Sequence, residues 1–280
     1  MNIKNKITTL LVAFLLFNIN VFTQPKMDSE NSQPMKTESK TIEKNQVKMT
    51  VLYDNYLFSE GTKTAWGFSC YIEGTEKIIL FDTGGEGEIL MHNIDKLNIS
   101  PESVEMIVIS HNHWDHTGGL FTFLEKKSGI PVYLPYSFPG EFIDKVKDAG
   151  ASVILTNKPV EICKDVFSTG EIEGPVNEQS LIVKTNKGIV VVTGCSNPGI
   201  VKIVKKAQEI MGEEIYLVFG GFHLMRHSEK DVKEIISQFR ELGVKKCGAT
   251  HCTGDKQINL FKEAYGNDYI EMGTGRVLEF

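Results

Sequence analysis

The sequence has little of several features that would set it apart from ordinary globular proteins. Five cysteines are scattered over 280 residues, which is too few for disulfides to hold a chain of this length together. Basic residues are not in excess, because 30 Lys and Arg stand against 36 Asp and Glu, for a formal net charge of -6. This acidic balance argues against nucleic acid as a partner. The hydrophobic content of 41% is sufficient for a large core.

Long hydrophobic runs are also missing. The N-terminal apolar run, residues 7–17, is roughly half of the about 20 residues that a transmembrane helix needs. Two lysines precede it and two asparagines interrupt the tail behind it, which is the layout of a secretory signal peptide. We therefore expect residues 1–23 to be cleaved before Gln24 and the protein to be periplasmic or secreted, with no membrane partner after cleavage. The alternative is an uncleaved membrane tether.

Behind this segment the composition changes twice. Residues 24–46 contain no aromatic and few aliphatic side chains, so they have nothing to bury, and we expect a flexible linker. Residues 47–280 alternate between strand and helix patterns without a further linker or an internal repeat. They are expected to form one domain.

The order of these patterns indicates the fold class. Strand patterns come first and helix patterns are interposed later, which favours an α+β protein with sheets packed together and helices outside them. The expected strands are 47–53, 68–73, 77–81, 106–109 and 131–134, with a hairpin of 180–185 and 188–193, and the expected helices include 88–97, 120–126 and 141–149.

The strongest chemical signal is the run His111-Asn-His113-Trp-Asp115-His116, directly after the apolar strand 106–109. It places three of the seven histidines and one aspartate within six positions, which packing does not explain. Imidazole nitrogens and carboxylate oxygens are common zinc ligands. Residues two apart on an extended turn point the same way, so His111 and His113 can hold one ion while Asp115 and His116 face a second. Two such ions would share a water and lower its pKa toward about 7.

This run resembles the H-x-H-x-D-H motif of the metallo-β-lactamase superfamily. Three later motifs, Thr193-Gly-Cys-Ser196, Gly220-Gly-Phe-His223-Leu224 and Thr250-His-Cys-Thr-Gly254, are similar to those of the branch of 7,8-dihydropterin-6-methyl-4-(β-D-ribofuranosyl)aminobenzene-5′-phosphate synthases. The resemblance implies a four-layered αββα sandwich with its metals at the sheet edge between the two halves. It also implies two divalent ions, zinc first, with manganese or iron as alternatives.

The resemblance assigns ligands residue by residue. His111 and His113 would bind the first metal, and Asp115, His116 and His251 the second. Asp115 would also be a catalytic carboxylate.

Other candidates keep two interpretations each. Asp82, in Phe81-Asp82-Thr-Gly84, is either a catalytic carboxylate that accepts a hydrogen bond from a metal ligand or water, or the residue that fixes this turn. His223 would bind metal or a substrate phosphate, or be structural. Arg226 and Arg276 are phosphate partners or surface charges.

One position departs from the branch. Its Gly-Cys-Ser-His motif ends here in Asn197, and an amide oxygen is a poorer ligand than imidazole, so one metal position is expected to be weakened. Cys195 would compensate as a thiolate ligand, or be a small buried residue of the turn. Cys252 is expected to pack rather than to bind metal.

These observations predict an enzyme that acts on a small molecule. The first hypothesis is a metal-dependent hydrolase of a phosphorylated or ester-bearing metabolite, with metal-bound hydroxide as the nucleophile. The alternatives are a synthase-type transferase that joins a pterin to a ribofuranosylaminobenzene phosphate, and a degenerate, non-catalytic metal-binding relative.

Overall fold

The computed structural model of this protein describes residues 46–280. The expected signal peptide, residues 1–23, and nearly all of the expected linker lie outside the described residues. Within residues 46–280, no helix combines the length and hydrophobicity needed to cross a membrane.

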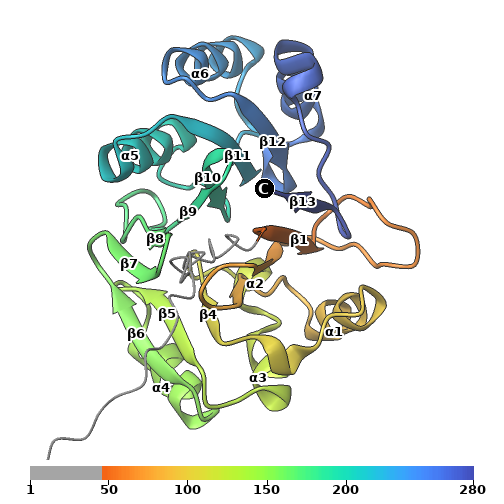
Figure 1. The fold of residues 1–280 in the computed structure, drawn as a ribbon, viewed down its shortest axis with the longest axis vertical. Coiled ribbons are helices and arrows are strands. Elements are labelled where there is room, and N and C mark those ends of the chain that lie inside the picture. The colour runs from red at the N-terminus through yellow and green to blue at the C-terminus, as the bar shows by residue number, and fades with distance from the viewer. Residues whose placement is uncertain (1–45) are drawn as a thin grey trace, which may run out of the picture. The chain divides into compact units, whose positions relative to one another are not determined.

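The first half of the described chain builds most of a seven-stranded sheet with the order β13-β1-β2-β3-β4-β5-β6 (Figure 1). Strands β3 to β6 run parallel to one another, whereas β13, β1, β2 and β3 pair antiparallel. The strands are β1 Lys48–Tyr53, β2 Ser69–Glu73, β3 Ile79–Phe81, β4 Met106–Val108, β5 Pro131–Pro135, β6 Ser152–Thr156 and β13 Val277–Glu279.

The second half forms a six-stranded sheet with the order β12-β11-β10-β9-β8-β7. Here β10, β11 and β12 are parallel, and the expected hairpin is present as the antiparallel pair β9 and β10. The strands are β7 Val160–Cys163, β8 Val166–Ser168, β9 Leu181–Thr185, β10 Gly188–Thr193, β11 Ile215–Gly221 and β12 Lys246–Thr250.

Helices cover the outer face of each sheet, with α1, α3 and α4 on the first and α5, α6 and α7 on the second (Figure 1). The helices are α1 Gly87–Lys96, α2 Trp114–Thr117, α3 Leu120–Lys126, α4 Gly140–Asp148, α5 Ile200–Met211, α6 Glu229–Glu241 and α7 Asp255–Tyr265, with 3-10 turns at Pro101–Ser103, His251–Thr253 and Gly266–Asp268. The expected four-layered αββα sandwich is confirmed.

Side-chain alternation along the strands produces these layers. In β10, Val190 and Val192 face the core between the two sheets, while Ile189 and Val191 face the helices of the second half. Because successive side chains of a strand point to opposite faces, a continuous apolar run is buried on both sides.

Strands β6, β7 and β8 were not among the expected elements. β6 and β7 are the outermost strands of their sheets, and most side chains of both are at least partly exposed. Edge strands of this kind lack the apolar alternation by which the other strands are identified.

The parallel strands of both sheets end at one common edge. Gly194, in the turn after β10, packs against Asp82 after β3 and Ser110 after β4. The contact is so close that a Cβ atom on Gly194 would lie 2.1 Å from the Ser110 hydroxyl oxygen. The backbone of Gln179 also donates to the Ser110 carbonyl across the two halves. Ligands of open α/β sheets bind at the carboxyl ends of the strands, so we expect a binding site at this edge.

Candidate metal centre

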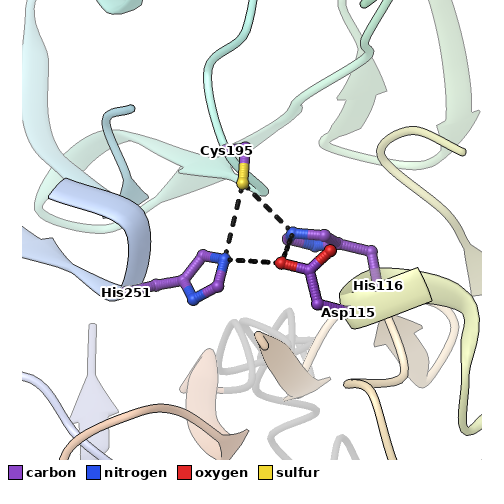
Figure 2. A group of neighbouring side chains, drawn as sticks. All are labelled: Asp115, His116, Cys195 and His251. Atoms are coloured by element: carbon purple, nitrogen blue, oxygen red, sulfur yellow. Dashed lines mark hydrogen bonds and ion pairs between the residues drawn. The ribbon is translucent and has the colours of Figure 1, made fainter. Parts of the chain in front are cut away.

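Four buried side chains converge at this edge: Asp115, His116, Cys195 and His251 (Figure 2). Asp115 and His116 lie on the short helix α2 after β4, Cys195 follows β10, and His251 follows β12. The distances from Cys195 Sγ are 3.2 Å to His116 Nε2 and 3.4 Å to His251 Nε2, and those from Asp115 Oδ2 are 3.3 Å to His251 Nε2 and 3.6 Å to His116 Nε2.

These distances fit a tetrahedral zinc site. Zinc bond lengths of about 2.0–2.1 Å to nitrogen and about 2.3 Å to sulfur give tetrahedron edges of roughly 3.3–3.6 Å. Four of the six donor pairs measure 3.2–3.6 Å, and all six lie within 4.8 Å. Two imidazoles, one thiol and one carboxylate thus form the corners of a site of the right size, and the structure brings together the predicted ligands Asp115, His116, His251 and Cys195.

The other two histidines of the motif lie next to this group. His111 Nε2 and His113 Nδ1 are 3.1 Å apart, and the His111 ring centroid is 4.2 Å from that of His116. The pair offers two nitrogen atoms to a second ion, as the sequence predicts.

Asp82 sets the orientation of the ligands in the first half. Its Oδ2 lies 2.7 Å from His116 Nδ1 and accepts a hydrogen bond of 2.7 Å from the Ser110 hydroxyl, which in turn lies 2.8 Å from His111 Nδ1. With Nδ1 of both rings donating along this chain, both Nε2 atoms keep their lone pairs for a metal. Asp82 therefore positions two imidazoles, that of His116 by direct contact and that of His111 through the Ser110 hydroxyl.

Burial and neighbouring charges together shift the pKa values of these groups. It lowers the pKa of His116 to about 3, so this ring is neutral and can bind metal. Burial also raises the pKa of Asp82 well above its usual range, while hydrogen bonds from Ser110 oppose the rise. For Asp115, burial is outweighed by the hydrogen bond with His251 and by the nearby imidazoles, which hold its pKa well below the usual range.

His251 is oriented by a residue that the sequence analysis did not identify. Asn55 Oδ1 lies 2.9 Å from His251 Nδ1, and Asn55 Nδ2 donates to the His251 carbonyl oxygen. With Nδ1 donating, His251 Nε2 is also free for a metal. The preceding residue, Asp54, accepts a hydrogen bond from the Thr250 hydroxyl, which lies 2.8–2.9 Å from both carboxylate oxygens, and so helps to hold the turn that carries His251.

Glu178 is a second residue that the sequence analysis missed. This fully buried carboxylate accepts hydrogen bonds of 2.8–2.9 Å from the backbone N–H groups of Cys195, Ser196 and Asn197. It therefore holds the turn that presents the Cys195 thiol. A single acid in the polar stretch before a strand carries no sequence signal for such a role.

The same carboxylate accounts for the position of Asn197. The Asn197 side-chain amide donates to Glu178 Oε2 at 3.0 Å. The structure thus brings Asn197 to Glu178, and this predicted ligand does not contribute to the four-donor group in Figure 2.

A cavity of about 510 Å³ opens beside the centre. Its lining residues are Trp66, His223, Met225, Arg226, His227 and Cys252. The Trp66 ring is 5.0 Å from the His251 ring, so the cavity reaches the metal ligands. Arg276 does not line it, because its guanidinium lies 4.6 Å from the centroid of the Phe58 ring instead.

Comparisons with known proteins identify the family. Residues 67–182 match the metallo-beta-lactamase superfamily. The chain is 32% identical to the 7,8-dihydropterin-6-methyl-4-(beta-D-ribofuranosyl)-aminobenzene-5′-phosphate synthase of Methanocaldococcus jannaschii, over 84% of this chain and 97% of that relative.

Two solved structures extend the comparison. Tm1679, a metal-dependent hydrolase of the β-lactamase superfamily, has a TM-score of 0.71 and 29% identity over 84% of this chain and 99% of its own. The metallo-beta-lactamase fold protein YhfI from Bacillus subtilis has a TM-score of 0.63 over 84% of this chain and 100% of its own. Because its sequence is 15% identical to this chain, the similarity shows the fold alone.

Proposed function

Because the chain belongs to the metallo-β-lactamase superfamily, as its motifs indicated, we propose that it is a metal-dependent hydrolase of a small phosphorylated or ester-bearing metabolite. The observation that carries this proposal is the four-donor group Asp115, His116, Cys195 and His251, whose spacing fits zinc. The adjacent His111 and His113 supply nitrogen atoms for a second divalent ion.

A bound divalent ion would polarise a substrate oxygen and make water more acidic. Side chains of the protein would orient the ligands and exclude solvent. Asp82 and Asn55 hold the imidazoles with Nε2 free, and Asp115, whose surroundings hold its pKa well below the usual range, would stay ionised as a ligand of the ion. Burial of these groups would exclude bulk solvent and strengthen each electrostatic contact.

The cavity beside His251 would bind the substrate. Trp66 offers an aromatic face for an apolar or ring-bearing part of the molecule, and Arg226 lines the same cavity and would bind a phosphate or carboxylate. A small molecule that carries both a ring and an anion fits this lining.

A second candidate is a transferase that joins a pterin to a ribofuranosylaminobenzene phosphate. The observation in its favour is the 32% identity to the synthase over nearly the full length of that relative. The Trp66 face and the Arg226 side chain suit a pterin and a phosphate as well as they suit a hydrolase substrate.

One set of assays distinguishes the two. The zinc-loaded protein is incubated with a phosphodiester, a lactone and a β-lactam. Separately, it is incubated with 4-(β-D-ribofuranosyl)aminobenzene 5′-phosphate and a dihydropterin whose 6-methylene carbon carries a diphosphate as the leaving group. We expect hydrolysis in the first set, reduced at least about 100-fold in Asp115→Asn and unchanged in His92→Gln, which alters a histidine on α1. Formation of the joined product without hydrolysis would favour the synthase, and no turnover by metal-loaded protein would favour a binding protein.

A further inference from the structure

A second group of donor atoms lies beside the four-donor group. Its members are Cys195, His223 and Cys252, whose sulfur and ring nitrogen atoms all lie within 4.8 Å of one another. We propose that these three residues form a further metal site, which takes a soft divalent ion such as Zn²⁺ or Cd²⁺ and shares the Cys195 thiolate with the site in Figure 2.

The fold places the three donors together from distant parts of the chain. Strands β10, β11 and β12 are adjacent and parallel. Cys195 follows the end of β10, His223 follows β11, and Cys252 lies in the 3-10 turn after β12. Each of three neighbouring strands therefore delivers one donor to the same edge of the sheet.

The backbone around the three donor residues leaves space for their side chains to come close together. A side chain on Gly221 would come within 2.7 Å of the Cys252 sulfur and 2.4 Å of the Gly194 carbonyl oxygen, so only glycine leaves room for the thiol. His223 has a left-handed backbone with φ 56°, which is uncommon for residues other than glycine and concentrates at functional sites.

The donor set matches a known type of zinc site. Two sulfurs and one imidazole are the protein ligands of catalytic zinc sites that keep a fourth position open. Thiolate ligands also select soft ions over magnesium or calcium. His223 is exposed, and it lines the 510 Å³ cavity together with Cys252. The cavity provides both an entry path for the ion and room for an exogenous fourth ligand.

Packing alone accounts poorly for these two cysteines. Neither is in a disulfide, and both place their sulfur atoms within 4.8 Å of a ring nitrogen of His223. By contrast, the buried Cys70 and Cys247 lie within strands among core side chains, where a thiol serves as a small apolar group. From the sequence, Cys252 was also expected to pack as a small apolar group.

The test is a titration of metal-free protein with Cd²⁺, followed by equilibrium dialysis and by the ultraviolet charge-transfer absorption of cadmium bound to thiolate. We expect Cys252→Ser to lose one equivalent of Cd²⁺ and part of the thiolate absorption. His223→Asn, which keeps a residue that tolerates a left-handed backbone, should bind that equivalent at least about 10-fold more weakly. Cys195→Ser should reduce binding at both sites, because both share its sulfur.

Cys163→Ser is the matched control, since Cys163 is a free, half-buried cysteine in β7 outside both donor groups, and it should bind like the parent. Parent-like Cd²⁺ stoichiometry, affinity and absorption in both Cys252→Ser and His223→Asn would overturn the proposal. If Cys252→Ser does not fold, the affinity of His223→Asn decides alone. A protein that binds the extra ion but hydrolyses nothing would refute the proposed function and leave this site standing.

Discussion

The two halves of the sandwich supply the candidate metal ligands in different ways. The first half delivers His111, His113, Asp115 and His116 from one short stretch after β4. The second half delivers single donors from separate strand ends, Cys195 after β10 and His251 after β12. The first set is arranged by a local turn and a short helix, and the second set is arranged only when the parallel strands of the second sheet are in register.

The supporting hydrogen bonds also differ between the two sets of donors. For the first set, one carboxylate, Asp82, orients His116 directly and His111 through Ser110. For the second set the supports are separate: Glu178 holds the turn of Cys195, and Asn55, which follows β1 in the first half, orients His251. A complete site therefore requires both the local motif and the correct packing of the two sheets.

The contact between the sheets gives the largest expected effect. Phe219 of β11 is fully buried in the core between the sheets, and its ring centroid is 6.5 Å from that of Phe68 in the other half. We expect Phe219→Ala to lower the free energy of unfolding by about 3–5 kcal/mol, through lost burial and a remaining cavity. Urea unfolding followed by circular dichroism measures this, with the partly exposed Phe58→Ala as a control that costs much less. A similar loss in both variants would contradict the role of the inter-sheet core.

The next prediction tests whether donors from the two halves share one ion. His116→Ala and His251→Ala should lose the same metal equivalent, because their Nε2 atoms both face Cys195 Sγ and Asp115 Oδ2. We expect affinity for that ion to fall at least about 100-fold, beyond the 10- to 100-fold range of residues that only orient a ligand. Elemental analysis of each purified variant is sufficient. Full metal content in one variant and loss in the other would show that the site is not shared.

A smaller effect is expected from the carboxylate that orients the first half. Asp82→Asn retains a side chain that tolerates the left-handed backbone at φ 56°, but it replaces a carboxylate acceptor by an amide. Metal affinity should fall about 10- to 100-fold, measured by competition with a chelator. Asp165→Asn makes the same change at another left-handed position, φ 65°, outside the centre. Equal affinities in the two variants would mean that Asp82 only fixes its own turn.

Asn197→His should have a smaller effect still. The sequence predicts that histidine here would strengthen a weakened metal position, whereas the structure brings the Asn197 amide to Glu178. We therefore expect metal affinity to change less than about 10-fold, in the same chelator competition. A larger gain would show that position 197 reaches the ion and that the branch's histidine is a ligand.

The N-terminal segment should have no effect on either half. We propose that the protein is exported and begins at Gln24, because the apolar run of residues 7–17 is short and a polar stretch follows it. N-terminal sequencing from the native host tests this, and a membrane-bound protein that retains Met1 would contradict it. A chain that starts at Gln24 should bind the same number of metal ions as the full chain.

Much of the fold was predictable because its signals are local. The continuous apolar runs of β9, β10 and β4 and the helical pattern of α4 each lie within a few residues. The exposed edge strands β6 and β7 lack such a pattern and were missed. Glu178 and Asn55 were missed for a different reason, since their roles depend on partners 17 or more and 196 positions away.

The family resemblance and the local run of candidate ligands could both be predicted from the amino-acid sequence, because His111 to His116 need only a strand end and one short turn to face a common point. Tertiary structure decided which other residues complete the centre. Cys195, His223, His251 and Cys252 meet because parallel strands bring their carboxyl ends to one edge, whatever the length of chain between them. It also decided where two other predicted residues lie. The Asn197 side-chain amide donates to the buried carboxylate of Glu178, and the Arg276 guanidinium lies over the Phe58 ring.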